Sequence, residues 1–219
     1  MNKKTNNKEK TETERSSENE SPDQLFNFFE RLKNISSIKR FGTLPMIQFE
    51  SVAAHSYNVA ILALLIADHE PEGTVNKEVL LKKALFHDFE ESILSDIPHT
   101  IKHRYKGGEL GKLLKNIVPD LIEEEIFKEL PHSVRSNYVH YSLTAKEGLE
   151  GQMVEAADAM DTMVTCVREL KLGNRYFENV FDISLKLVSK YTQFKFVSTF
   201  LEQAVHYVKD STKPNIEKI

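Results

Sequence analysis

Two histidines and two aspartates stand where helical periodicity turns them toward the protein interior. His55 shares a helix face with the apolar Val59, and Asp88 lies on the apolar side of a later segment with His87 one step round. Asp158 adjoins the apolar stripe of a third segment. A buried carboxylate without a partner costs free energy, whereas two carboxylates and two imidazoles together satisfy one divalent cation. The pattern therefore predicts a metal site with nitrogen and oxygen ligands, built from three helices.

Each of these residues also has a simpler interpretation when it is taken alone. A lone buried histidine is more often a hydrogen-bonded core residue than a ligand, and a lone aspartate often accepts an internal hydrogen bond. The joint orientation of the four residues and their order along the chain favour the metal site. Glu91, one helical turn beyond His87 and Asp88, overhangs the same patch.

Helices must position these side chains, and apolar periodicity predicts them along most of the chain. The expected helices cover residues 23–35, 52–68, 77–91, 108–117, 121–130 and 151–170, with a last helix or pair over 180–208. Asp23 and Asn76 are expected as N-caps. The residues expected to face inward are Leu25, Phe28, Phe29 and Leu32, then Val79, Leu80, Ala84 and Leu85, then Met153, Ala157, Met160, Val164, Val167 and Leu170. Few segments alternate with period two, so we predict an all-α fold.

The domain organisation follows from composition. Residues 1–22 hold no aromatic residue and, after Met1, no aliphatic one, so they are expected to form a disordered polar tail. Residues 23–210 are expected to form one domain, and residues 211–219 a short C-terminal tail.

Composition and charge also limit the possible functions. The formal net charge of −4 disfavours a broad nucleic-acid-binding surface. The single cysteine, Cys166, excludes an intrachain disulfide and is expected to be an inert core thiol. The N-terminus shows no apolar signal segment, and the longest apolar run, Val59–Ala67, is too short for a membrane span. We therefore expect a soluble, cytoplasmic protein with no membrane partner.

The order of the four residues resembles a known family. His55, then His87-Asp88, then Asp158 is similar to the H…HD…D pattern of HD-domain metal-dependent phosphohydrolases. The stretches "RFGTLP…ESVAAHSYNVA", "HDFEESILSDIPHTIK" and "EAADAMD" resemble the 5′-deoxynucleotidase subfamily, the YfbR-like and HD-domain-containing protein 2 group. The resemblance covers about residues 25–170 and implies an HD-domain helical bundle with the metal site between its helices.

The resemblance implies a ligand set and a reaction. The expected metal ligands are His55, His87, Asp88 and Asp158. The metal itself stays open among Mn, Co, Zn, Fe and Mg. The implied function is hydrolysis of the 5′-phosphate from nucleoside or deoxynucleoside 5′-monophosphates.

Glu91 and Asp96 are the expected catalytic residues. Glu91 is expected to position the attacking water or to act as general acid–base; the alternative is a surface partner of a lysine or backbone N–H. Asp96 precedes Ile97-Pro98 and is expected to protonate the leaving 5′-oxygen or to bind the sugar 3′-hydroxyl. Its alternative is a residue that only forms the turn.

Substrate binding is expected to involve Arg40, Phe41 and Lys102. Arg40 and Lys102 are the candidate phosphate cations, with arginine the better bidentate partner. Bacterial 5′-deoxynucleotidases have an Arg-Trp pair where this chain has Arg40-Phe41, and that tryptophan helps to exclude the ribose 2′-hydroxyl. Phe41 keeps an aromatic wall without the indole bulk, so the sugar preference stays open.

Two other functions remain alternatives. One is a dNTP triphosphohydrolase on the same metal site, and the other is a non-catalytic interaction module with an HD-like fold. Asp161, one turn beyond Asp158, is either a support for the ligands or an exposed carboxylate. The aromatic content of residues 188–208 also suggests a homodimer, although that segment is equally suited to closing the core of a monomer.

Overall fold

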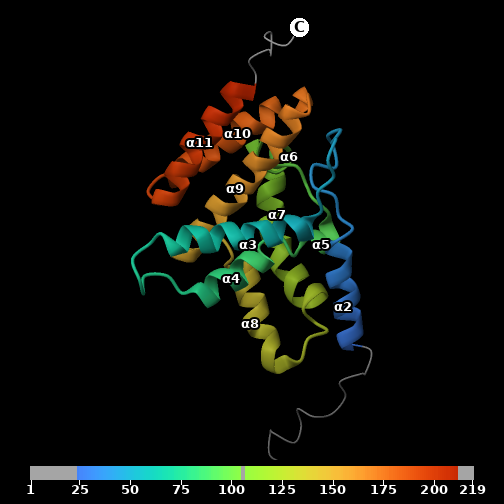
Figure 1. Ribbon diagram of the computed structural model, residues 1–219. Coiled ribbons are helices and arrows are strands. Elements are labelled where there is room, and N and C mark those ends of the chain that lie inside the picture. Colours follow the sequence, from blue (N-terminus) through green and yellow to red (C-terminus); the bar gives the residue numbers. More distant parts are fainter. Residues whose placement is uncertain (1–23, 105–106, 212–219) are drawn as a thin grey trace, which may run out of the picture.

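The computed structural model describes residues 24–104 and 107–211, and within them the chain is helical (Figure 1). The tail residues 1–22 and the expected N-cap Asp23 lie outside these ranges. The α-helices are α2 Gln24–Ile35, α3 Val52–Asp68, α4 Lys77–Phe86, α5 Glu91–Leu94, α6 His99–Arg104, α7 Glu109–Asp120, α8 His132–Leu143, α9 Gly148–Lys171, α10 Glu178–Val188 and α11 Lys195–Ser211. A π-helix, η2, covers Leu121–Ile126, and two 3-10 turns, η3 and η4, cover Arg175–Phe177 and Ser189–Tyr191.

The all-α prediction is confirmed, because the only β-pairing in the described ranges is an isolated bridge between Lys39 and Ser51. Helix α3 has the predicted bounds, and Asn76 caps α4 by accepting a hydrogen bond from the Val79 amide. The last predicted helix is indeed a pair, α10 and α11. Helix α8 was not predicted, because its sequence has little apolar periodicity.

One boundary was predicted wrongly, and it affects the site. The helix expected to run to Glu91 ends at Phe86, and residues 87–90 form turns before α5 begins. His87 lies at the end of α4, where its ring Nδ1 donates to the carbonyl of Ala84 at 2.7 Å. The chain therefore bends where the His-Asp pair stands, and helical spacing does not set the direction of Asp88.

The core divides into two clusters that meet near α3. The larger cluster joins α3, α4, α9, α10 and α11, which Figure 1 shows on both sides of the crossing of α3 and α9. The smaller cluster is aromatic, with Phe89 and Phe127 stacked at a ring-centroid distance of 5.4 Å. His55 and Val59 lie fully buried on α3, as predicted.

Some residues predicted to face inward are exposed, namely Leu25, Phe29, Leu32, Leu85 and Val164. Helix α2 lies at the edge of the molecule and enters the smaller cluster through Phe28 and Ile35. Such an edge helix buries a narrower stripe than its apolar pattern suggests. Cys166 is buried as predicted, and burial raises the pKa of its thiol to about 12.

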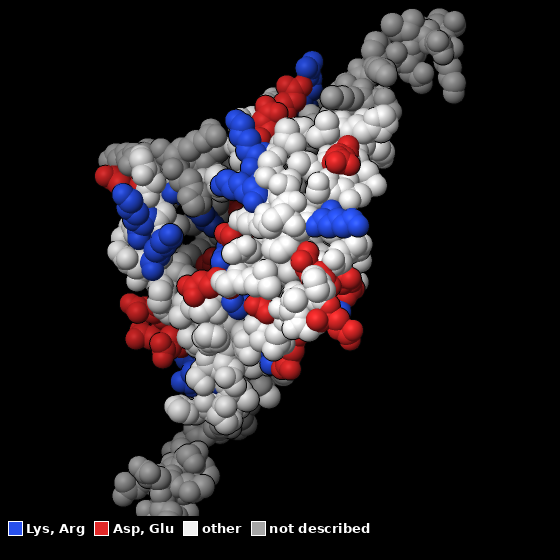
Figure 2. Space-filling model, turned by 90° about the vertical axis from the view of Figure 1, so that its left-hand side faces the viewer, with Lys and Arg blue, Asp and Glu red and all other residues white. Residues whose placement is uncertain are grey.

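The C-terminal aromatic segment belongs to the core. Phe194 and Val197 are buried against the larger cluster, so the segment suspected of self-association packs within the monomer. None of the described helices has the length and hydropathy that a bilayer span needs. On the face shown in Figure 2, basic and acidic side chains are interspersed, and a hollow has Lys or Arg side chains on both of its sides.

Candidate metal centre and active site

The hydrogen bonds of His55 and His87 fix which ring nitrogen faces the site. The Nδ1 of His87 lies 2.7 Å from the Ala84 carbonyl, which only accepts, so this nitrogen carries the proton. The Nδ1 of His55 lies 2.6 Å from Oδ2 of Asp161, which acts in the same way. With the proton on Nδ1, a ring that binds a metal as neutral imidazole offers the lone pair of its Nε2 atom.

These two lone pairs point at each other and at two carboxylates. The Nε2 atoms are 3.3 Å apart, and Oδ1 of Asp158 lies 3.3 Å from Nε2 of His55. Oδ2 of Asp88 lies 3.1 Å from Nε2 of His87 and 3.6 Å from that of His55. Two Nε2 lone pairs and two carboxylate oxygens that face one another repel unless a cation lies among them. These four nitrogen and oxygen ligand atoms therefore fit a divalent metal. Ligand atoms of His55, His87 and Asp158 all lie within 4.8 Å of one another.

The carboxylates remain charged, which suits ligands. Burial raises the pKa of Asp88, but the neighbouring His87 outweighs burial and holds it well below its usual range. Burial likewise opposes ionisation of Asp158, yet Lys146 and His55 lower its pKa well below the usual value. The Asp88 and Asp158 side chains are 17% and 24% exposed, whereas His55 is fully buried, so the site opens on its carboxylate side.

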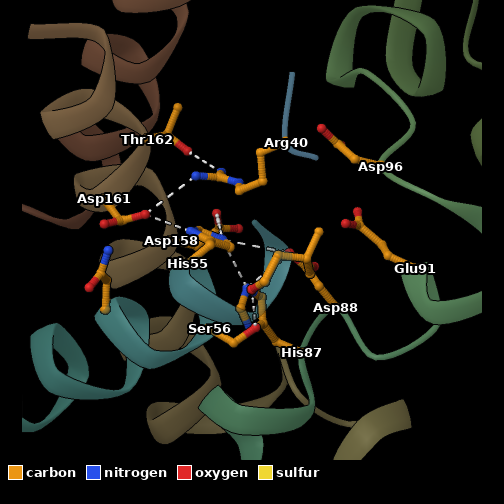
Figure 3. A network of polar contacts seen from close by, with 12 residues as sticks. Arg40, His55, Ser56, His87, Asp88, Glu91, Asp96, Asp158, Asp161 and Thr162 are labelled. Carbon is orange, nitrogen blue, oxygen red and sulfur yellow. Dashed lines mark hydrogen bonds and ion pairs between the residues drawn. The ribbon is translucent and has the colours of Figure 1, made fainter. Parts of the chain in front are cut away.

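A second acidic group lies behind His55 and already has a cation. Glu50, His55 and Asp161 also bring ligand atoms within 4.8 Å of one another, but the guanidinium of Arg40 lies among them. Arg40 donates to Glu50 at 2.8 Å, to Asp161 at 3.3 Å and to the Thr162 hydroxyl at 3.0 Å (Figure 3). Asp161 is 4% exposed and supports His55, which excludes the alternative of an exposed carboxylate. Arg40, predicted to bind phosphate, is 9% exposed and has these protein partners.

Glu91 begins α5 and faces the site without joining the ligands. Its side chain is 6% exposed, and Nζ of Lys102 lies 3.6 Å from its Oε1. Burial, together with the charges of Asp88 and Asp96, raises the pKa of Glu91 to about 10. In Figure 3, Glu91 and Asp96 lie together on one side of Asp88, and the His55–Asp161 pair lies on the other. A carboxyl with a raised pKa beside a metal site is suited to proton transfer.

Asp96 contacts the loop before α3 instead of stabilising its own turn. Its Oδ2 accepts a hydrogen bond from the Phe41 amide at 2.6 Å. Among the described residues, Phe41 and Ser95 are the two non-glycine residues with positive φ, 54° and 62°, and they flank this contact. Such backbone conformations are strained and cluster at functional sites. The Phe41 ring packs edge-on against Phe177. The backbone and the side chain of Phe41 are therefore both held in place, by Asp96 and by Phe177 respectively.

A cavity of about 360 Å³ adjoins His87 and Asp88, two of the four expected ligands. Its polar side includes His87, Asp88 and Glu91, and its other side is apolar. The apolar residues are Leu94, Ile97, Leu114, Val118, Pro119, Ile122, Leu143 and Ala145. Its size lies within the range of small-molecule sites, which combine apolar walls with a few polar groups.

Three lysines line this cavity, and the sequence pointed to one of them. Lys102 was predicted, whereas Lys115 on α7 and Lys146 before α9 were not. Lys146 stands in a turn 12 residues before Asp158, and its Nζ lies 3.1 Å from Oδ2 of that residue. A lysine in a turn carries no periodic signal, so the sequence offered no means of finding it.

Comparison with known sequences identifies a family and relatives that cover most of the chain. The family model described as 5′-deoxynucleotidase YfbR-like matches residues 27–208. A 5′-deoxynucleotidase of Pectobacterium atrosepticum is 29% identical over 160 residues, or 68% of this chain and 76% of that protein. A 5′-deoxynucleotidase of Yersinia pestis is 29% identical over 163 residues, or 70% and 78%.

Solved structures share the fold. An HD-domain phosphohydrolase of Listeria innocua is 25% identical, with a TM-score of 0.73 over 89% of this chain and 92% of that one. The cyanophage S-2L HD phosphohydrolase DatZ, solved with dA and one catalytic Zn²⁺ ion, is 20% identical, with a TM-score of 0.56 over 83% and 96%. Both similarities agree with the predicted HD-domain bundle.

Proposed function

The chain belongs to the 5′-deoxynucleotidase YfbR-like family, and on this premise we propose that it hydrolyses nucleoside or deoxynucleoside 5′-monophosphates to nucleoside and phosphate. The observation that carries the proposal is the pair of facing Nε2 atoms of His55 and His87, set among the Asp88 and Asp158 carboxylates at the mouth of a cavity. These four side chains are the proposed ligands. A divalent ion held by them would act as a Lewis acid toward the phosphoryl group and would lower the pKa of water, so that a hydroxide nucleophile forms near neutral pH.

The residues of the chain have separate tasks in this reaction. Glu91 positions the attacking water or acts as general acid–base, and its burial and raised pKa favour the protonated form, which can donate a proton. Asp96 lies beside Glu91 and against the Phe41 amide, where it donates a proton to the leaving 5′-oxygen or binds the sugar hydroxyl. These tasks follow from the placement of the two carboxyls beside Asp88.

The substrate is held by the walls of the site. Lys102, whose side chain is 27% exposed at the cavity, is a phosphate cation. Arg40 is the second proposed phosphate residue, and its contacts with Asp161 link phosphate binding to the support of His55. The Phe41 ring faces the sugar, and the apolar side of the cavity accommodates the base.

The test is release of orthophosphate, pyrophosphate and triphosphate from a panel of ribo- and deoxynucleoside mono- and triphosphates. Mn²⁺, Co²⁺, Zn²⁺ and Mg²⁺ are supplied in turn, beside the Asp88→Ala variant. Orthophosphate from monophosphates alone supports the proposal and ranks bases and sugars. Turnover confined to triphosphates replaces it with the dNTP triphosphohydrolase, and no turnover with any metal replaces it with the interaction module.

We also propose that the protein works as a homodimer in the cytoplasm, where nucleoside monophosphates are made and consumed. The α2 helix presents an exposed apolar face, comprising Leu25, Phe26, Phe29 and Leu32. Contiguous apolar faces of this kind commonly mark protein interfaces. Light scattering after size exclusion tests the dimer: Phe26→Asp is expected to give a monomer, and a wild-type monomer contradicts the proposal.

A further inference from the structure

Lys146 lies at the metal ligands although it stands in a turn far from them in sequence. Its Nζ lies 3.1 Å from Oδ2 of Asp158, and the other oxygen of that carboxylate faces His55. The Lys146 side chain is 43% exposed, and it lines the same cavity as Asp88 and Glu91. We propose that Lys146 is a phosphate-binding residue of the active site and contacts the phosphate held beside Asp88 and Asp158.

The backbone on both sides of Lys146 is held in place by contacts with buried residues. Lys83, only 7% exposed, donates from Nζ to the carbonyl of Glu147 at 2.6 Å. Burying a lysine costs free energy, and the hydrogen bond from Lys83 to the turn that carries Lys146 offsets part of that cost. Ala145, on the other side of Lys146, is buried.

The start of α9 approaches the same turn closely. Gly151 is buried, and a Cβ there would lie 3.0 Å from Cα of Lys146 and would overlap its carbonyl carbon. Glycine is therefore required where the helix carrying Asp158 meets the turn carrying Lys146. The two side chains are held on two backbones in direct contact, so their proximity does not depend on a flexible loop.

The charges in the site call for a further cation beside Arg40 and Lys102, whose charges are partly offset by protein carboxylates. Arg40 is paired with Glu50 and Asp161, and Lys102 lies beside Glu91. A nucleoside monophosphate brings close to two negative charges at neutral pH. A divalent ion is balanced by Asp88 and Asp158, so the incoming phosphate needs a further positive charge. Lys146 supplies this positive charge. When Asp158 binds the metal, the negative charge of its carboxylate is shared between the metal and Lys146, so Lys146 is less fully neutralised.

The ammonium group of Lys146 can contact Asp158 and a phosphate at the same time. The ammonium group has three N–H donors, so one can keep the contact with Asp158 while others reach a phosphate oxygen. Binding to this already charged group forms a charge-assisted hydrogen bond.

The experiment rests on the proposed function but measures binding separately from hydrolysis. Titration calorimetry follows Mn²⁺ binding to the full chain, and then binding of inorganic phosphate to the Mn²⁺-loaded protein. In Lys146→Ala, Mn²⁺ affinity is expected within about threefold of wild type, and phosphate affinity is expected to fall roughly 10- to 100-fold, the worth of one hydrogen bond to a charged group. The KM for a nucleoside monophosphate is expected to rise, and Lys146→Arg to restore part of the phosphate affinity.

Two more variants separate binding from folding. Lys83→Met removes the donor that holds the turn and is expected to weaken phosphate binding in the same direction but less than Lys146→Ala. Lys77→Ala removes an exposed lysine paired with Asp68 outside the site and is expected to change neither affinity.

The outcomes distinguish this proposal from the proposed function. Unchanged phosphate affinity in Lys146→Ala overturns the assignment, even if the wild type is an active nucleotidase. Loss of Mn²⁺ binding together with phosphate binding also overturns it, because Lys146 would then support the ligands. Lys146-dependent phosphate binding in a wild type that hydrolyses no nucleotide upholds the phosphate site and refutes the nucleotidase.

Discussion

The Nδ1 atom of His55 and the Oδ2 atom of Asp161 lie 2.6 Å apart in the core, and Arg40 contacts the same carboxylate oxygen at 3.3 Å (Figure 3). The carboxylate keeps the proton on Nδ1 and so leaves Nε2 free to bind a metal. Burial and the charge of Arg40 lower the pKa of His55, but hydrogen bonds to the Asp158 and Asp161 carboxylates raise it overall. The proposed ligand His55 is therefore oriented by a residue outside the proposed ligand set.

Asp161→Ala is expected to weaken metal affinity by about 10- to 100-fold, because His55 loses the partner that fixes its orientation. The measurement is calorimetric titration with Mn²⁺ or Zn²⁺ at constant pH. Asp161→Asn keeps an acceptor for Nδ1–H and should show a smaller loss. Asp182→Asn, an exposed change on α10, is the control. Wild-type metal affinity in Asp161→Ala would remove Asp161 from the site.

His87→Ala and Asp88→Ala are each expected to abolish metal binding and hydrolysis, since each removes one of four acceptors around one point. A ligand that binds only the folded state stabilises it, by about 2.7 kcal/mol at 100 times its dissociation constant. Added Mn²⁺ should therefore raise the melting temperature of the wild type but of neither variant. Full activity in either variant would refute the ligand assignment.

Glu91→Gln is expected to keep the metal and lose roughly 10²- to 10⁴-fold in kcat, because the amide cannot transfer a proton as the carboxyl can. Glu91 lies beside Lys102 at the cavity and has no contact with His55 or His87 like those of Asp88 and Asp158 among the described residues. Metal titration and single-turnover rates are measured on the same preparation, with the exposed Glu78→Gln as control. If the metal were lost with the rate, Glu91 would be reassigned as a ligand.

Helical periodicity located His55 and Asp158, because both stand inside long helices where spacing along the chain fixes the face. It was less reliable where the chain turns. His87 and Asp88 were found from their type and order, although the helix expected to carry them ends at Phe86. The contact between Asp96 and Phe41 joins residues 55 positions apart, so no local sequence pattern predicts it. It also depends on the positive φ angles of Phe41 and Ser95, which the sequence does not indicate.

Phe41→Trp is expected to raise the ratio of kcat/KM for deoxyribo- over ribonucleotides by roughly 10-fold, because the larger ring narrows the space for a 2′-hydroxyl. The hydrogen bond from the Phe41 amide to Asp96 involves the backbone, so the substitution leaves it in place. The assay compares matched ribo- and deoxynucleoside monophosphates of the same base, with Phe49→Trp, an exposed ring, as control. An unchanged ratio would show that the ring does not face the sugar.

Glu169 holds the loop that carries Arg40 and Phe41, and its effect on stability should depend on pH. Its carboxylate is 1% exposed and accepts hydrogen bonds from the amides of Ile47 at 2.9 Å and Gln48 at 2.7 Å. Burial raises its pKa, but these donors and the Asn174 amide outweigh burial and lower it from the ordinary 4.5.

Glu169→Gln is therefore expected to cost about 1–3 kcal/mol of unfolding free energy at pH 7, since a neutral amide replaces a charged acceptor. A carboxyl with a lowered folded-state pKa stabilises the protein above its unfolded pKa, and that contribution disappears as the pH falls through the folded-state value. The difference between wild type and variant should thus be full above pH 4.5 and shrink below it. Urea unfolding at pH 7, 5 and 3.5 measures this difference, and a constant gap would mean that the charge of Glu169 does not hold the loop.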